Sequence, residues 1–139
     1  MTGIEQSADS KTILFVEDDP AVREMTCDIL RQGGYVVLPA DSERQALKAW
    51  DRFAKRIDVL LTDVMIPYRS TGLELARKLK RAKPDLKVVF TSGFGPEICS
   101  GVPVLTGGLF LPKPFSATAL LQTIVISLKS GEESAYELN

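Results

Sequence analysis

The sequence predicts an α/β protein in which a doubly wound, five-stranded parallel sheet is covered by helices on both faces. Two observations indicate this fold. Short apolar stretches alternate five times with longer amphipathic stretches along the chain. The short stretches are apolar at almost every position, as expected for parallel strands that are buried on both sides. The 139 residues suffice for one such domain, and we find no internal repeat or linker.

The five expected strands are short and rich in β-branched and large apolar residues. Each is followed by polar residues or by a turn. They cover residues 12–16, 35–38, 59–62, 88–91 and 109–111. About five helices should connect and follow them.

Capping residues mark the starts of the first two helices. Asp19 can cap a helix whose first residue is Pro20, and Gly33 with Gly34 should end that helix. Ser42 followed by Gln45 has the pattern of a capping box, which predicts a second helix from this point.

The later helices are marked in a similar way. The third helix should end before Pro84, and Ser116 should cap the last one. The stretch 93–108 holds five glycines and two prolines, so the fourth helix should be short or irregular. We expect one folded domain over residues 11–130, with flexible tails at 1–10 and 131–139.

Composition excludes several classes of function. The formal net charge is −1, which gives no basic surface for nucleic acid. No apolar stretch is long enough to span a membrane, and the first ten residues are polar, unlike a secretory signal, so we expect a cytoplasmic protein. Cys27 and Cys99 form no C-x-x-C pair, and the chain has no histidine, which excludes histidine ligands and bases.

Polar residues follow the strands at the edge where parallel sheets bind their ligands, the carboxyl ends of the strands. They are Glu17, Asp18 and Asp19 after the first strand, Asp63 after the third, Thr91 and Ser92 after the fourth, and Lys113 after the fifth. Clustered carboxylates need a counter-ion, and Mg²⁺ suits oxygen ligands. An Asp carboxylate can attack phosphorus and a lysine can bind phosphoryl oxygens, so this set fits phosphoryl transfer.

Four motifs carry a family resemblance. In this order and spacing, ILFVEDDP, DVLLTDVMIP, VFTSGF and FLPKPF resemble the receiver domains of bacterial two-component response regulators. The resemblance covers about residues 11–130 and implies a flavodoxin-like sheet with strand order 2-1-3-4-5. It implies that Asp63 is the phosphoacceptor, that Asp18 binds Mg²⁺ directly, and that Glu17 acts through a metal-bound water. The backbone carbonyl of Met65 would complete the protein ligands.

The resemblance also implies the residues that respond to the phosphoryl group. Lys113 would contact it, and the Lys113–Pro114 bond would be cis. Ser92 corresponds to the switch hydroxyl, with Thr91 as the alternative if the alignment shifts by one residue. Phe110 corresponds to the aromatic side chain whose rotamer reports phosphorylation.

The expected function is therefore a signalling switch, not an enzyme with an external substrate. Its catalysis would be limited to its own phosphorylation and dephosphorylation. The donor would be a sensor histidine kinase or a histidine phosphotransfer protein, and the signal would pass to an unknown downstream protein. We expect no contact with nucleic acid or membrane. The sequence leaves open whether the chain forms a homodimer.

Two alternatives stay open beside this function. One is an aspartate-nucleophile phosphohydrolase, although such enzymes resemble D-x-D and Met65 stands at the second position. The other is a receiver-like interaction domain that is not phosphorylated. The complete set of acids, hydroxyl and lysine argues against it.

Overall fold

The computed structural model describes residues 10–64, 72–93 and 108–138. Three sequence predictions fall outside these ranges. One is the short or irregular fourth helix, of which residues 94–107 are not described. Another is the metal-binding carbonyl assigned to Met65. The third is the flexible tail at 1–10, of which residues 1–9 are not described.

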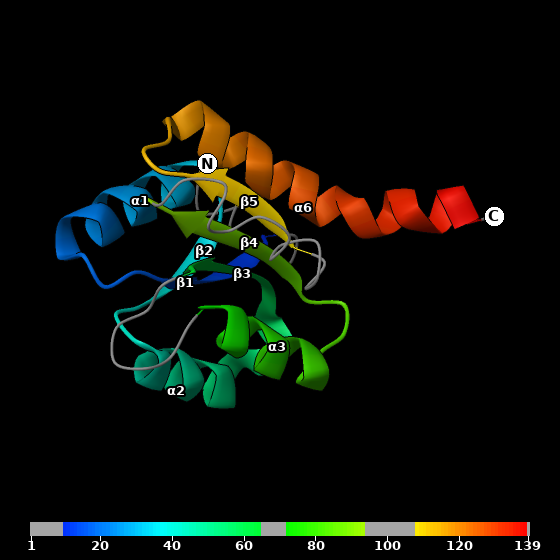
Figure 1. Ribbon diagram of the computed structural model, residues 1–139, viewed down its shortest axis with the longest axis horizontal. Coiled ribbons are helices and arrows are strands. Elements are labelled where there is room, and N and C mark those ends of the chain that lie inside the picture. The colour runs from blue at the N-terminus through cyan, green and yellow to red at the C-terminus, as the bar shows by residue number, and fades with distance from the viewer. Residues whose placement is uncertain (1–9, 65–71, 94–107, 139) are drawn as a thin grey trace.

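The five predicted strands are present and form one parallel sheet. They are β1 (Thr12–Val16), β2 (Val36–Ala40), β3 (Ile57–Asp63), β4 (Lys87–Ser92) and β5 (Leu109–Pro112). Their order is β2-β1-β3-β4-β5, which confirms the predicted order (Figure 1). All four neighbouring pairs run parallel. The carboxyl ends of all strands therefore meet at one edge of the sheet.

Helices cover both faces of the sheet, as the doubly wound arrangement requires. The described helices are α1 (Pro20–Gln32), α2 (Glu43–Phe53), the short 3-10 helix η2 (Ala54–Arg56), α3 (Gly72–Ala82) and α6 (Ala117–Leu138). In Figure 1, α1 and α6 lie on one side of the sheet and α2 and α3 on the other.

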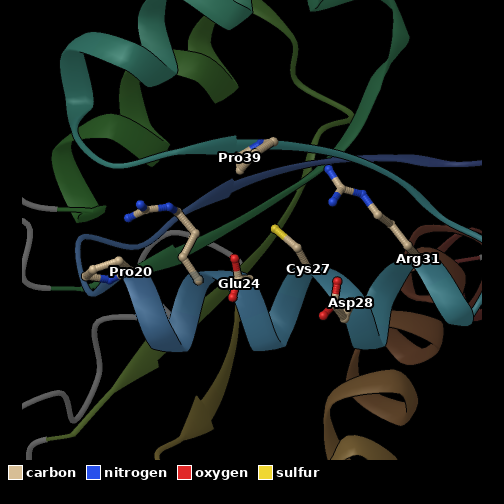
Figure 2. A pocket seen from close by; sticks show the side chains of 7 residues that line it. Pro20, Glu24, Cys27, Asp28, Arg31 and Pro39 are labelled. Atoms are coloured by element: carbon tan, nitrogen blue, oxygen red, sulfur yellow. The ribbon is translucent and has the colours of Figure 1, made fainter.

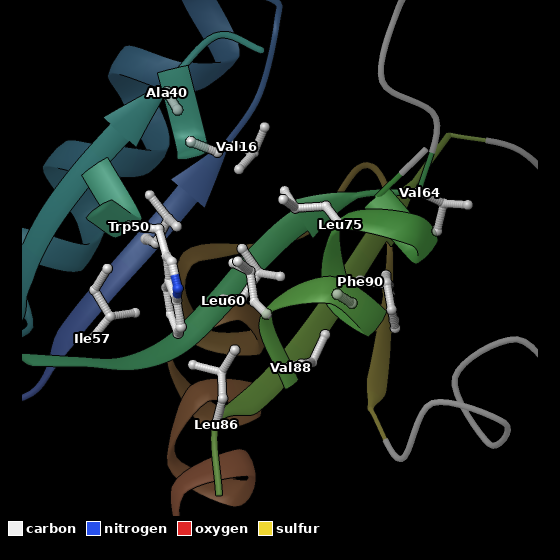
Figure 3. Packing of buried hydrophobic residues seen from close by; sticks show 14 residues of the cluster. Val16, Ala40, Trp50, Ile57, Leu60, Val64, Leu75, Leu86, Val88 and Phe90 are labelled. Carbon is white, nitrogen blue, oxygen red and sulfur yellow. The ribbon is translucent and has the colours of Figure 1, made fainter. Parts of the chain in front are cut away.

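Two apolar layers hold the helices against the sheet. The layer under α2 and α3 includes Trp50, Leu75 and Phe90 (Figure 3). The layer under α1 and α6 includes Leu30 and Leu120 together with residues of the strands. Alternation along each strand assigns neighbouring residues to opposite layers. Each large apolar side chain that becomes fully buried stabilises the fold by about 1.5–3 kcal/mol. The two layers together hold the strands in place, and with them the strand ends that carry the polar residues.

The predicted caps are confirmed. Asp19, Ser42 and Ser116 each accept a hydrogen bond from a backbone N–H in the first turn of their helix. Helix α1 ends at Gln32 with Gly33 as its C-cap, and the next residue, Gly34, has φ of 98°, a left-handed conformation that favours glycine. The polar side chains of the sequence thus set where α1, α2 and α6 begin.

Helix α6 is longer than the sequence analysis expected. The residues after 130 were assigned to a flexible tail, but the backbone stays helical to Leu138. No proline interrupts this stretch, and its Glu, Ala and Leu residues favour a helix. Within the described ranges, no helix combines the length and apolar character needed to cross a membrane.

Candidate functional site

Three carboxylates meet at the carboxyl edge of the sheet. Glu17 and Asp18 directly follow β1, and Asp63 ends β3, the strand beside it. The register pairs Val16 with Thr62, so Glu17 and Asp63 come next on the two strands. Each of the three acids offers an oxygen, and these oxygens lie within 4.8 Å of one another. Chain topology therefore concentrates negative charge at one point.

Lys113 supplies the opposite charge. Its Nζ lies 2.7 Å from Oε1 of Glu17 and 2.8 Å from Oδ2 of Asp63. Lys113 directly follows β5, and its N–H donates to the carbonyl of Ser92, which extends the strand ladder to this residue. The Lys113–Pro114 bond is cis, as the resemblance implied. The side chain must cross the end of β4, because β4 lies between β5 and β3.

Burial and pairing have opposite effects on these charges. Glu17 is 2% exposed, and burial raises its pKa although Lys113 and the N–H of Asp19 donate to its carboxylate. Burial alone would lower the pKa of Lys113, but its hydrogen bonds to Asp63 and Glu17 outweigh burial and raise it. The ammonium group is therefore held charged beside the carboxylates.

The three acids of the β1–α1 connection have different surroundings. Asp19 turns to the helix, where its Oδ1 accepts hydrogen bonds from the N–H groups of Ala21 and Val22. Asp18 is exposed and belongs to the carboxylate cluster, whereas Asp19 does not. Asp18 is thus the member of this pair that is free of the capping role.

Arg23 holds the backbone of this connection. Its Nη1 donates to the carbonyl oxygens of Glu17 at 2.8 Å and Asp18 at 3.4 Å. Sequence reasoning missed this contact. Arg23 lies four residues after the cap, so its position near the start of α1 could be predicted from the sequence. The carbonyl oxygens to which it donates could not.

Arg23 also lines a groove between α1 and β2. The groove has a volume of about 250 Å³, and Figure 2 shows the thiol of Cys27 pointing toward Pro39 within it. Arg31 closes the other end by donating to the carbonyl of Val37. Burial raises the pKa of the Cys27 thiol, so at neutral pH it stays protonated.

The two candidate hydroxyls lie on opposite faces of the sheet. Ser92 shares its face with Phe90, and the register pairs Phe90 with Phe110, so Ser92 and Phe110 are on the α2–α3 side. Thr91 alternates with them and faces the α1–α6 side, as does Leu111, its partner on β5. Only Ser92 is therefore on the same face as Phe110.

Gly72 closes the site from the start of α3. Its N–H donates to the carbonyl of Val64, and an added Cβ would collide with the carbonyl oxygen of Asp63. Only glycine permits this close approach without a shift of the backbone. Nothing in the sequence pattern distinguished Gly72 from a glycine in an ordinary turn.

Most of the predicted site residues are brought together. Glu17, Asp18, Asp63 and Lys113 form one cluster, and Ser92 and Phe110 lie on strands beside it. The cluster offers carboxylate oxygens, and the chain has no histidine. Oxygen ligands of this kind fit a hard divalent cation such as Mg²⁺.

Comparison with known proteins identifies the family that this site belongs to. A family model described as the response regulator receiver domain matches residues 13–125. The sensor kinase CckA of Brucella abortus is 35% identical over 116 residues, which make up 83% of this chain and 12% of the kinase. This chain thus spans only a small part of that relative.

Two further relatives are comparable in size with the chain. The response regulator receiver protein CpdR of Brucella abortus is 36% identical over 85 residues, which cover 60% of this chain and 68% of CpdR. A solved CheY-like receiver domain protein from Methanospirillum hungatei superposes with a TM-score of 0.79 at 27% identity. That match covers 91% of this chain and 99% of the solved one.

Proposed function

Because the chain belongs to the response regulator receiver domain family, we propose that Asp63 is the residue on which it accepts a phosphoryl group. Receiver domains have the phosphoacceptor role in two-component signalling. One observation carries the assignment to Asp63: its carboxylate lies 2.8 Å from the ammonium of Lys113 and within 4.8 Å of the nearest Asp18 and Glu17 oxygens.

The phosphoryl group must come from outside these 139 residues, because they include no histidine to carry it. We propose a phosphohistidine of a sensor histidine kinase or of a histidine phosphotransfer protein, which the domain would meet in the cytoplasm. A carboxylate oxygen of Asp63 attacks phosphorus, the bond from phosphorus to the histidine nitrogen breaks, and an acyl phosphate forms. Water later cleaves the acyl phosphate and releases inorganic phosphate.

Each neighbouring residue has a part in this transfer. Asp18 and Asp63 would bind Mg²⁺ directly, Glu17 through a water, and the carbonyl of Met65 would add a further ligand. When bound, the ion neutralises the charge of the carboxylates and of the phosphoryl oxygens. Lys113 gives a phosphoryl oxygen a fixed positive charge. These residues act on the protein's own Asp63, so we assign no external substrate.

The signal would leave through Ser92 and Phe110. A phosphoryl group is a strong acceptor that draws a nearby hydroxyl toward itself. Ser92 is fully buried at the end of β4 and shares its sheet face with Phe110 on β5. We propose that movement of the Ser92 hydroxyl toward Asp63 opens space for the Phe110 ring, which presents a changed surface to a downstream protein.

Incubation with acetyl phosphate and Mg²⁺ tests the proposal. Intact mass spectrometry should show one added phosphoryl group on the wild-type chain and none on Asp63→Asn. Equal labelling of the two proteins would exclude Asp63 as the acceptor. Hydrolysis of a generic phosphomonoester, measured in parallel, should stay at the level of the buffer.

A further inference from the structure

Thr91 carries a buried hydroxyl that forms no hydrogen bond with the described residues. The residue is 1% exposed, and Oγ1 has no hydrogen-bond partner in the part of the chain that the structure describes. Buried polar groups without a partner are rare in folded proteins, because they lose water and gain nothing in return. Such a group at the edge of a functional site requires an explanation.

Its place in the sheet brings Thr91 next to the proposed phosphoacceptor. The register pairs Thr91 with Asp63 on one side and with Leu111 on the other. Paired residues of parallel strands project from the same face. Thr91 therefore lies between Asp63 and β5, on the α1–α6 side of the sheet, and Lys113 follows Leu111 by two residues on that same side.

The side chain of Lys113 crosses the end of β4, the strand that carries Thr91. Its Nζ reaches Asp63 and Glu17 from the end of β5, across the end of β4. An ammonium group has three N–H donors, and the two carboxylates take two of them. Thr91 is thus a buried acceptor on the strand that this cation crosses, and within the described ranges the carboxylates leave one of the three donors without a carboxylate partner.

We propose that Thr91 is a positioning residue whose hydroxyl accepts a hydrogen bond from Lys113 once Asp63 carries its phosphoryl group. This inference rests on the proposed function. The phosphoryl group replaces the direct pairing of the Asp63 carboxylate with Lys113, so the ammonium must shift to reach the new oxygens. Thr91 Oγ1 then holds it in its new place. The buried hydroxyl destabilises the unphosphorylated state, and the hydrogen bond to Lys113 removes this destabilisation in the phosphorylated state.

This role differs from that of the switch hydroxyl. Ser92 lies on the face of Phe110, whereas Thr91 lies on the opposite face, next to Leu111. A substitution at Thr91 should therefore change how well the phosphorylated state is held, without removing the group that is proposed to report it.

Thr91→Val is the direct test, since valine keeps the shape and removes the hydroxyl. Metal-free T91V should unfold at the same temperature as wild type or higher, and should bind Mg²⁺ alone with unchanged affinity. Its affinity for beryllofluoride, a phosphoryl mimic, at saturating Mg²⁺ should fall about fivefold, the size expected for one hydrogen bond. Thr91→Ser, which keeps a hydroxyl, should stay within about twofold of wild type.

Calorimetric titration distinguishes the outcomes. Unchanged beryllofluoride affinity in T91V would overturn the proposal, as would equal losses for Mg²⁺ alone and for the mimic, since these would indicate general distortion of the site. If T91V does not fold, Thr91→Ala gives the same comparison. If wild type itself does not bind beryllofluoride, the proposed phosphoacceptor function is wrong. The role proposed for Thr91 is then wrong as well, because it depends on that function.

Discussion

The ammonium of Lys113 lies 2.8 Å from the carboxylate of Asp63, although 50 residues separate the two in the sequence. The same ammonium lies 2.7 Å from Glu17, which is 96 residues away. The strand order β1-β3-β4-β5 makes both contacts possible, because it places the ends of these strands at one edge. Lys113 is therefore the counter-charge that two carboxylates of the site share.

Lys113→Met should destabilise the metal-free protein by about 2 kcal/mol near neutral pH, because two neighbouring carboxylates lose their buried counter-charge. Urea unfolding of wild type and variant measures the difference. Lys78→Met is the matched control. Lys78 pairs with Glu43 on the exposed surface, so its loss should change stability by less than about 0.5 kcal/mol. A larger effect for Lys78 than for Lys113 would contradict the account.

The effect of Lys113→Met should depend on pH. The pKa of Lys113 is raised in the folded state, so its contribution is complete below pH 10.5 and disappears as the pH rises through the folded value. The pKa of Glu17 is also raised, which favours folding most below pH 4.5, where Glu17 is protonated. The difference in free energy of unfolding between wild type and Lys113→Met should therefore become smaller as the pH falls toward 4.5. A difference that grows toward acid pH would contradict an electrostatic origin.

Asp18→Ala and Asp19→Ala should separate metal binding from helix capping. Asp18 belongs to the carboxylate cluster, so its loss should weaken Mg²⁺ binding and phosphorylation together. Asp19 caps α1, so its loss should cost about 1 kcal/mol of stability and leave Mg²⁺ binding in place. Calorimetric titration measures Mg²⁺ binding, acetyl phosphate labelling measures phosphorylation, and urea unfolding measures stability. The reverse assignment would show that the metal ligand is Asp19.

Gly72→Ala should distort the site through the backbone. The new Cβ would meet the carbonyl oxygen of Asp63, and we expect a loss of about 1–3 kcal/mol together with slower phosphorylation. Gly93→Ala is the control, because a Cβ there has no heavy atom of the described residues within 4 Å. Thermal unfolding and acetyl phosphate labelling of both variants check the prediction. Equal behaviour of the two would mean that the approach of Gly72 to Asp63 is unimportant.

Cys27 should react slowly with iodoacetamide. In a Cys99→Ser variant, where only Cys27 can react, the rate at pH 8 should be at least about tenfold below that of free cysteine. Cys27 is 4% exposed and the pKa of its thiol is raised, so its reaction rate should still increase above pH 9.0, the ordinary pKa. Unfolding in urea should restore the full rate. Reaction of the folded protein at the rate of free cysteine would show that Cys27 is accessible.

The strands and the identity of the acids were predictable because both depend on local sequence. Each apolar stretch ends where a polar residue begins, and this placed Glu17, Asp63 and Lys113 at strand ends. Caps such as Asp19 and Ser42 act within one helical turn, so their partners are near in the sequence.

Contacts that depend on three-dimensional packing were not predictable. The guanidinium of Arg23 could have pointed to solvent, and no local pattern indicates that it donates to the carbonyl of Glu17. Gly72 resembles any turn glycine until α3 is packed against β3. Which of Thr91 and Ser92 shares its face with Phe110 became clear only from the strand register. The length of α6 was underestimated because its polar end was interpreted as a tail.

Locating the phosphoryl group within the chain tests the central claim most directly. The acyl phosphate formed with acetyl phosphate and Mg²⁺ is reduced by borohydride, which converts the modified aspartate to homoserine. Tandem mass spectrometry of the digested protein then identifies the position. The account predicts homoserine at position 63 alone, and only in protein treated with both acetyl phosphate and Mg²⁺. Homoserine at Asp18 or at any other aspartate, with position 63 unmodified, would contradict it.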